Sequence, residues 1–565
     1  MSEMIIRGGS LIDGTGAAAR PADVRVNQGV VTEVGPNLKP NGETELDASS
    51  CYVTPGFIDS HTHLDPYMFW DRGCDPMPQH GVTTALIGNC SLSLAPAKPE
   101  HLDELIDVFC YVEDLPVVDF KTGVPWNWTT WQQYCQAMNQ EGTALNIIPL
   151  VGHTMLRTYA MGEDAWTRKA TEQEISTMTE ELADAMAAGC FGFSTSFQHQ
   201  DRNGRLVPSQ LACDTELAAL ADVLVATGHG LVEFVPNFME GDLGADISRM
   251  ASVLGNRKVT SLWNALVHSD RAPEVPDQLM ALTQTIRDGG CNMWPLASPR
   301  TIDININWDS TMVFLKFPQG WNKIMGVTGQ HRAEMLADPG WREIARKEWD
   351  SPDNALYTST WANLVRCTSV TNPKNEVWLG HPLADLVAAR GGHTSDVLAD
   401  WILENNLEPG LVMTGAANSN VDAIGQILAD DRCLISASDA GAHVQMMCAA
   451  GDSTLLLTRH VRDRGDLTLE KAIYEITGRQ ADVLGLHNRG RLAPGYAGDV
   501  TVFNLDELSW ETDSFVADLP SGARRLRRPP GGYRATAIGG VLTQTEGTLT
   551  GAHPGTALNS NTTNP

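Results

Sequence analysis

Residues 53–63 have the sequence VTPGFIDSHTH, an apolar run that ends in an aspartate and two histidines. Seven further apolar runs that end in polar residues follow along the chain, and segments of helical period lie between several of them. This pattern is typical of repeated βα units, and eight strands close a (β/α)8 barrel. We therefore predict an α/β fold with a TIM barrel, and a doubly wound open sheet is the alternative. The seven runs are 81–90, 144–153, 190–197, 230–237, 259–267, 291–299 and 433–441.

Both ends of the chain carry short alternating apolar runs separated by Gly, Asn and Pro, as in an antiparallel sheet. We predict that residues 1–54 and 491–552 form one β-sandwich domain beside a barrel domain at 55–490. A tryptophan-rich insertion at about 300–410 is too long for a simple loop, and it is either a lid over the barrel mouth or a rigid scaffold. Residues 553–565 are predicted to be a disordered tail.

The composition argues against nucleic acid as a partner. The chain has 565 residues, and 40 basic against 69 acidic residues give a formal net charge of −29, which repels phosphate backbones and anionic lipid. The arginine-rich run 523–534 is short, so we interpret it as a subunit or domain contact. Neither a GxxxxGK[ST] phosphate loop nor a GxSxG motif is present, which excludes phosphoryl transfer and serine hydrolase chemistry.

The cysteines and the N-terminus indicate the compartment. The 11 cysteines form no CxxC pair, which is typical of buried thiols in a reducing environment. The N-terminus has no long apolar run before a cleavage site, and no stretch reaches about 18 uninterrupted apolar residues. We predict a cytoplasmic protein that does not enter a membrane.

The ends of three predicted strands carry metal-binding residue types. His61 and His63 are two apart on an extended chain, so both imidazoles point the same way and reach one ion. Cys90 ends the second run and Asp439 ends the eighth. Imidazole, thiolate and carboxylate at one barrel mouth favour zinc. The alternatives are a buried inert thiol for Cys90 and a helix N-cap for Asp439.

Four further residues are candidates for the barrel mouth. His153 follows the third run and is a candidate catalytic group that polarises a carbonyl; a structural hydrogen bond is the alternative. Arg300, His443 and Asn264 are candidate substrate-binding residues. An ion pair with the acidic surface is the alternative for Arg300, and a capping or loop role is the alternative for His443.

Six motifs in this order make the chain similar to the amidohydrolase superfamily, in its D-aminoacylase branch. They are PGFIDSHTHLDPYMFWD, HGVTTALIGNCSLSLAP, VGHTMLR, GFSTSF, SDAGAH and NRGRLAPGYAGDVTVFN. The resemblance covers most of the chain. It implies a (β/α)8 barrel beside a small β-sandwich, hydrolysis of an amide-like bond at a metal centre, and assembly into a homo-oligomer.

The resemblance also assigns roles to residues. His61, His63 and Asp439 match the first metal position of the family, and Cys90 matches its bridging cysteine. Asp439 is then the general base, which takes a proton from a metal-bound water, and the general acid, which passes that proton to the leaving nitrogen. The resulting hydroxide is the expected nucleophile.

The sequence departs from the deacylase pattern on two strands. The deacylases carry one histidine on the fifth strand and one on the sixth, whereas here the predicted strands hold none; His229 precedes the fifth and His268 follows the sixth. The alternative substitute ligands are Glu233, or His268 in a register that turns it inward. We expect Trp263 and Asn264 to fill the space of a second ion, so one Zn²⁺ is predicted, with two as the alternative.

The sequence thus predicts a metal-dependent hydrolase that cleaves an amide-type C–N bond of a small molecule. Within enzymes, the alternatives are hydrolysis of a lactone, cyclic amide or carbamate, or a non-hydrolytic reaction at the same Lewis-acid site. The missing histidines keep open a third alternative, a metal-free binding protein on the same scaffold.

Overall fold

The computed structural model describes residues 3–238, 241–306, 308, 312–314, 317–325, 327–436 and 438–563. The chain divides into two compact units, and each is described by itself. Unit 1 comprises residues 1–300, 422–442 and 448–565, and unit 2 comprises residues 301–421 and 443–447.

Parallel strands form the centre of unit 1, and each of the eight predicted runs contains at least one of them. One sheet has the order β10-β9-β8 and another has the order β11-β12-β13-β14-β15-β19, with every neighbouring pair parallel. With helices between these strands, the predicted α/β class is confirmed. The bounds are β8 Phe57–Asp59, β9 Val82–Ile87, β10 Asn146–Pro149, β11 Val151–Gly152, β12 Gly192–Ser196, β13 Leu231–Val235, β14 Thr260–Leu266, β15 Met293–Ala297 and β19 Leu434–Ile435.

Hydrogen bonds connect the two parallel sheets at both ends. The Phe191 N–H donates to the Pro149 carbonyl at 3.0 Å, which joins the β10 side to the β12 side. After β8 and β19, Thr62 and Ala440 form a parallel bridge, and the His63 N–H donates to the Ala440 carbonyl at 2.7 Å. The first and last predicted strands therefore lie side by side where they lead into the candidate site.

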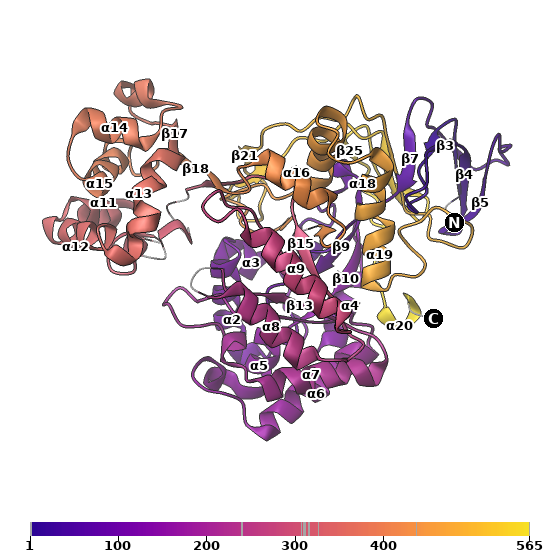
Figure 1. Cartoon of the computed structure of the whole chain (residues 1–565), viewed down its shortest axis with the longest axis horizontal. Coiled ribbons are helices and arrows are strands. Elements are labelled where there is room, and N and C mark those ends of the chain that lie inside the picture. The colour runs from indigo at the N-terminus through magenta and orange to yellow at the C-terminus, as the bar shows by residue number, and fades with distance from the viewer. Residues whose placement is uncertain are drawn as a thin grey trace. The chain divides into compact units, whose positions relative to one another are not determined.

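Helices of unit 1 follow the strands, and α9 packs against β15 (Figure 1). Three helices between the predicted runs, α6, α7 and α9, precede the fourth, fifth and seventh runs, in agreement with the segments of helical period in the sequence. Thr171 and Glu174 form a capping box at the start of α6, which satisfies backbone donors there. The bounds are α1 Tyr67–Trp70, α2 Leu102–Val112, α3 Val117–Gly123, α4 Trp131–Asn139, α5 His153–Met161, α6 Glu172–Ala187, α7 Asp214–Thr227, α8 Leu243–Leu254, α9 Val275–Asp288, α16 Val421–Ala429, α17 Asp452–Leu455, α18 Leu469–Ile476 and α19 Gly478–Leu484.

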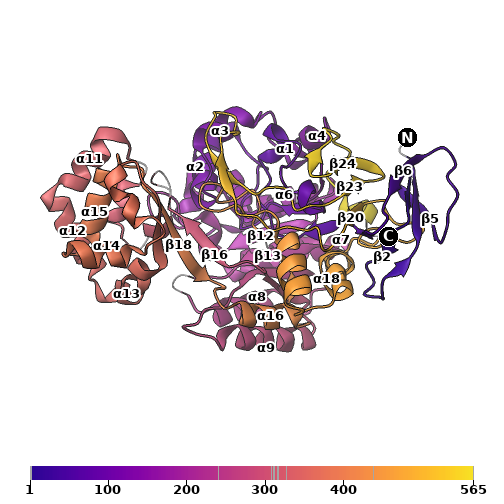
Figure 2. The same cartoon turned by 90° about the horizontal axis from the view of Figure 1, so that it is seen from above.

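The two ends of the chain meet in a seven-stranded sheet with the order β25-β24-β23-β20-β7-β2-β3 (Figure 2). A four-stranded sheet, β5-β4-β1-β6, shares an apolar cluster with it that includes Ile6, Val24, Val53 and Val500. The bounds are β1 Glu3–Arg7, β2 Ser10–Leu11, β3 Arg20–Pro21, β4 Asp23–Asn27, β5 Val30–Gly35, β6 Thr44–Asp47, β7 Tyr52–Pro55, β20 Val500–Phe503, β23 Ala535–Ile538, β24 Val541–Thr545 and β25 Thr548–Leu549, with a separate β21–β22 pair at Ser514–Val516 and Arg525–Arg527.

Unit 2 corresponds to the predicted insertion and has its own core. Buried tryptophans, including Trp321, Trp361 and Trp401, form that core with Phe314 and Phe317. Strands β16, β18 and β17 form an antiparallel sheet that contains none of the eight predicted runs. The bounds are α10 Trp321–Ile324, α11 Gly329–Ala337, α12 Pro339–Trp349, α13 Ala355–Leu364, α14 Leu383–Arg390, α15 Thr394–Glu404, β16 Ile302–Asn305, β17 Val365–Ser369 and β18 Gly410–Ala417.

The prediction of a disordered tail is wrong for residues 553–563. Gly555 and Ala557 form bridges with Thr143 and Ile147, and α20 spans Ser560–Thr563. Leu558 is buried in the apolar cluster formed by the parallel strands. The polar composition suggested disorder, but the segment satisfies its backbone groups by pairing and buries one leucine. Residues 564–565 lie outside the described residues.

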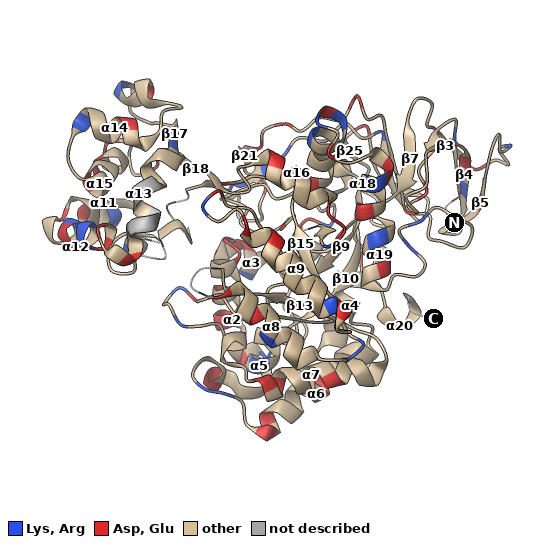
Figure 3. Ribbon diagram, viewed as in Figure 1, with Lys and Arg blue, Asp and Glu red and all other residues tan. Residues whose placement is uncertain are grey.

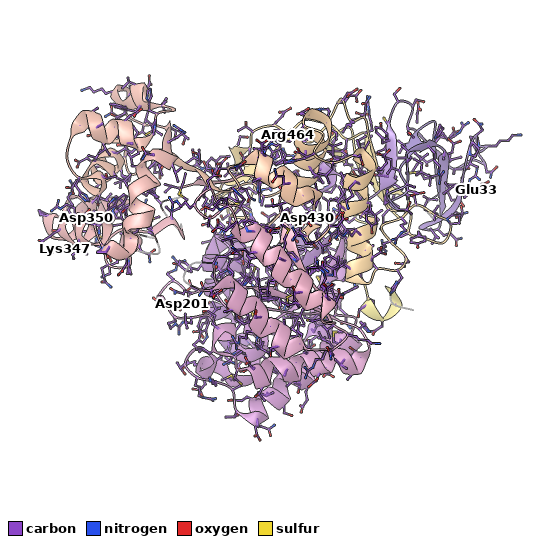
Figure 4. All side chains as sticks on the ribbon, viewed as in Figure 1. Glu33, Asp201, Lys347, Asp350, Asp430 and Arg464 are labelled. Atoms are coloured by element: carbon purple, nitrogen blue, oxygen red, sulfur yellow. The ribbon has the colours of Figure 1, made fainter. Side chains whose placement is uncertain are left out.

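Along the described chain, Lys and Arg are interspersed with Asp and Glu (Figure 3). Labelled side chains such as Lys347 project from the ribbon (Figure 4) and form exposed ion pairs, which contribute little stability. Within the basic run, Arg525 and Arg527 pair with Asp75, and Arg534 pairs with Glu507. These pairs favour the interpretation of the run as a contact within the molecule. In the described residues, no helix combines the length and apolar character needed to cross a bilayer.

Candidate metal centre

Two imidazoles follow β8 side by side. His61 and His63 are at most 1% exposed, and their ring centroids lie 5.3 Å apart at an interplanar angle of 72°. The Nε2 atom of His61 lies 3.5 Å from Asp439 Oδ1, and the Nε2 atom of His63 lies 3.2 Å from the same oxygen. Both rings therefore present the same nitrogen to one carboxylate.

Cys90 and Asp439 complete the group from two other strand ends. The Cys90 Sγ lies 3.6 Å from His61 Nε2, and ligand atoms of Cys90, His61 and His63 all lie within 4.8 Å of one another. Both Cys90 and Asp439 have a left-handed backbone, with φ of 56° and 66°, a conformation that non-glycine residues seldom adopt outside constrained sites. The Asp439 side chain is 30% exposed, whereas the histidines are enclosed, so solvent reaches Asp439 but not the two imidazoles.

The fifth and sixth strands bring Glu233 and Asn264 to this group. Glu233 Oε2 accepts a hydrogen bond of 2.9 Å from the Cys90 N–H, and its Oε1 lies 3.8 Å from His61 Nδ1. Asn264 Nδ2 lies 3.4 Å from His61 Nε2, as expected of a side chain that fills this space. The expectation that Trp263 also fills the space of a second ion is wrong, because its indole N–H donates to Thr283 of α9. Neighbouring residues of a strand point to opposite faces, and Asn264 takes the inner one.

Sequence reasoning missed Glu113, which follows the end of α2 and is 2% exposed. Its Oε1 lies 3.4 Å from His63 Nδ1. The available signal was an acid directly after the apolar run FCYV, since a buried carboxylate needs a partner. That signal does not identify the partner.

The group carries an excess of negative charge. Burial, followed by the charge of Glu233 and Glu113, raises the pKa of the Cys90 thiol well above its usual range. Burial raises the pKa of Glu233 to about 7 and that of Glu113 well above its ordinary value. Burial alone lowers the pKa of His61, but the hydrogen bond with Asp439 and the charge of Glu233 raise it overall. Nitrogen, sulfur and oxygen donors in an anionic pocket fit a divalent cation.

The structure does not bring His153 to this group in the way a catalytic role requires. Both of its ring nitrogens are engaged, Nδ1 with Thr195 Oγ1 at 3.0 Å and Nε2 with Glu216 Oε1 at 2.8 Å. Arg157 donates to both oxygens of Glu216 at 2.5 Å, and His153, Arg157 and Glu216 are fully buried. These contacts favour the structural hydrogen bond that the sequence left open.

Arg300 is 7% exposed, and its guanidinium donates to two backbone carbonyls, Ser438 at 2.7 Å and Cys448 at 3.2 Å. Its Nε lies 3.8 Å from Asp452 Oδ1. These contacts favour a structural role over a substrate anchor, although the acidic partner is the buried Asp452 and not the acidic surface named as the alternative. His443 belongs to unit 2, so its contact with a substrate stays a prediction.

The two histidines that flank the fifth and sixth strands lie outside the group. His229 Nε2 lies 3.0 Å from Ser560 Oγ in the C-terminal segment, and His268 Nδ1 lies 3.8 Å from Asp270. Within the part of the chain that the structure describes, only His61, His63 and Cys90 form a His, Cys or acidic cluster with ligand atoms close enough for one ion.

Comparison with known proteins finds amidohydrolases by sequence profile and by sequence similarity. The sequence profile of the amidohydrolase family matches residues 44–272 and 391–543. An N-acyl-D-aspartate deacylase of Alcaligenes xylosoxydans xylosoxydans is 35% identical, over 92% of this chain and 89% of the relative.

Two solved structures share the fold at 22% identity and cover 99% of this chain. One is an N-acyl-D-glutamate deacylase from Bordetella bronchiseptica, complexed with zinc and a phosphonate inhibitor, with a TM-score of 0.69 and 99% of its own chain covered. The other, with a TM-score of 0.68 and 100% of its own chain covered, is from a study of the binuclear metal centre in D-aminoacylase.

Proposed function

This chain belongs to the amidohydrolase family, and from that premise we propose that it hydrolyses the amide bond of an N-acyl-D-amino acid. The observation that carries the proposal is the convergence of His61, His63 and Cys90 within 4.8 Å, with one Asp439 oxygen facing both imidazoles. The substrate class is taken from the names of the deacylase relative and the deacylase structures.

We infer that the parallel strands of unit 1 close into the predicted (β/α)8 barrel. The bridge between Thr62 and Ala440 supports closure, because it joins the segment after β8 to the segment after β19. The shared apolar cluster of the two sheets at the chain ends supports the β-sandwich. On this architecture the metal centre lies at the carboxyl ends of the strands, where barrel enzymes place their catalytic groups.

We propose that His61, His63, Cys90 and Asp439 hold one divalent ion, with zinc as the expected metal. The donor set of two imidazoles, one thiol and one carboxylate suits zinc, and a cation bound here would offset the charge of Glu233 and Glu113 that helps to raise the pKa of Cys90. Glu233 and Asn264 stand where strands five and six face the group, which favours one ion over two.

An ion held by His61, His63, Cys90 and Asp439 would supply Lewis acidity, the chemistry that lowers the pKa of water and polarises an amide carbonyl. Asp439 accepts a proton from the attacking water on its carboxylate, and then donates that proton to the leaving nitrogen. A C–O bond forms, the C–N bond breaks, and the products are a carboxylic acid and a free amine. The exposure of Asp439 fits this role, because the carboxylate must reach both water and substrate.

Asn264 is the substrate-binding candidate that the geometry supports best. It lies next to His61, and its Oδ1 is buried without a hydrogen-bond partner in the described structure. A substrate N–H or O–H group placed there would satisfy that oxygen. A small-molecule substrate and assembly into a homo-oligomer remain part of the proposal.

Elemental analysis and a substrate panel test the proposal together. Protein purified without added metal or chelator is expected to contain about one zinc per chain, and to release amino acid from N-acetyl-D-aspartate and N-acetyl-D-glutamate faster than from the L-enantiomers. Two ions per chain would contradict the single site. Absence of metal together with absence of turnover after zinc addition would overturn the function.

A further inference from the structure

Each metal-binding histidine has a buried carboxylate behind it. Glu233 Oε1 lies 3.8 Å from His61 Nδ1, and Glu113 Oε1 lies 3.4 Å from His63 Nδ1. The two glutamates come from unrelated elements, since one is on β13 and the other follows α2. In both pairs the carboxylate faces Nδ1, while Nε2 faces Asp439.

These two carboxylate oxygens lack other partners. Glu233 and Glu113 are at most 2% exposed, and in the described structure neither Oε1 accepts a hydrogen bond. A buried carboxylate oxygen is costly without a donor, and the nearest suitable donor in each pair is an Nδ1–H group. A neutral imidazole that carries its proton on Nδ1 has its lone pair on Nε2, the nitrogen that points to the shared site.

We propose that Glu233 and Glu113 are positioning residues that fix the tautomer and orientation of the metal-binding histidines. Glu233 holds His61 with Nδ1 protonated, and Glu113 does the same for His63. The inference rests on the proposed metal site, and it adds residues that touch neither the ion nor the substrate.

Glu233 has a second task that Glu113 does not share. Its Oε2 accepts the Cys90 N–H at 2.9 Å, and Cys90 has a left-handed backbone. One carboxylate therefore connects the side chain of one proposed ligand to the backbone of another. Replacing it should disturb two ligands, whereas replacing Glu113 should disturb one.

Glutamine variants provide the direct test. In E233Q and E113Q an amide NH₂ group can face Nδ1, and this arrangement favours the Nε2–H tautomer, which cannot bind metal through Nε2. The matched control is E475Q, because Glu475 is 1% exposed, pairs with Arg479 at 2.7 Å and lies on α18, outside the group. The E475Q variant shows how much zinc affinity changes when a buried carboxylate outside the group is lost.

Two measurements separate positioning from stability. Long-range proton–nitrogen NMR on metal-free, histidine-labelled protein, recorded above the pH at which Glu233 and Glu113 ionise, should report Nδ1–H at both histidines in wild type and E475Q, a change only at His61 in E233Q and a change only at His63 in E113Q. Chelator competition should give a zinc dissociation constant raised about 10–100-fold in each of the two site variants, and raised more in E233Q than in E113Q.

Tautomers unchanged in both variants, or zinc affinities equal to that of E475Q, would overturn the inference. If a glutamine variant fails to fold, E233D and E113D replace it, because the ionised aspartate keeps an acceptor-only side chain. These variants should retain the wild-type tautomer and bind zinc with intermediate affinity. Loss of the wild-type tautomer in them would also overturn the inference. Failure of wild type to bind zinc would refute the proposed function instead, and the NMR measurement would still decide the tautomer.

Discussion

Unit 1 contains two buried groups of histidines and carboxylates, and they reach charge balance differently. Around His153, Glu216 is paired with Arg157, so the group contains its own cation. Around His61 and His63, in the residues that the structure describes, the nearby glutamates form no ion pair with lysine or arginine.

The pKa shifts of the two groups have opposite signs. Burial alone would raise the pKa of Glu216, but its hydrogen bond with His153 and the charges of His153 and Arg157 hold it below its usual range. Burial raises the pKa of Glu233 to about 7. The carboxylate of Glu216 is thus neutralised within its own group, whereas the glutamates around His61 and His63 have no such lysine or arginine partner among the described residues, which agrees with the proposed cation site.

The largest effect is expected from removing both imidazoles. The double variant His61→Asn, His63→Asn loses two ligands, so bound metal should disappear and kcat/KM should fall on the order of a thousandfold or more. Elemental analysis and kinetics on the same preparation measure both. If the double variant keeps its metal, the group around His61 and His63 is not the metal site, and it no longer differs in this respect from the group around His153.

Asp439→Asn should lower kcat by about 10²–10⁴-fold, the usual contribution of a general acid–base group. Metal should remain bound, since His61, His63 and Cys90 are still present. Kinetics with metal analysis test this, and unchanged kcat would assign proton transfer to another residue.

Glu216→Gln should act on stability alone. Breaking a buried pair leaves Arg157 uncompensated, and the free energy of unfolding should fall by about 3–5 kcal/mol. Metal content per folded chain should match that of the wild type. Denaturant unfolding measures the first quantity, and a loss of metal would mean that the two groups are coupled.

Zinc should stabilise the metal-free protein. At a free zinc concentration of 100 times the dissociation constant, the free energy of unfolding should rise by about 2.7 kcal/mol. The E216Q variant should gain the same increment, and the variant without His61 and His63 should gain none. Unfolding curves with and without zinc test this, and equal gains in all three proteins would place the ion elsewhere.

The smallest effect concerns pH. The pKa of His153 is lowered, chiefly by burial, and that of Glu216 is held below its usual range, so both groups bind protons more readily in the unfolded chain. Their contribution to stability is present above pH 6.5 and is lost as the pH falls below 6.5 and then below 4.5. The stability difference between wild type and E216Q should therefore shrink as the pH falls below 4.5, where the contribution of Glu216 is lost, and a constant difference in that range would contradict the pairing.

The sequence predicted the residues at strand ends well, because alternation and position fix their direction. His61, His63, Cys90 and Asp439 end apolar runs, and the structure brings them together. Glu113 was not predictable, since it lies 50 positions from His63 and their contact depends on how α2 packs.

Two other failures have local causes. The orientation of Trp263 depends on which of two adjacent strand residues faces inward, and a slip of one residue reverses it. The C-terminal segment was misjudged from composition, since one buried leucine and its paired backbone outweigh a polar sequence. Such long-range pairing leaves no signal in a single sequence.

The pairing of β7 with β20 constrains how the chain is made. Tyr52 lies opposite Phe503, so about 450 residues are synthesised between the two partners. At about 5–20 residues per second, the β7 edge waits roughly 20–90 seconds for its neighbour. During that interval the edge is open to association with other nascent chains, so slower translation or loss of the last strands should increase aggregation in the cell.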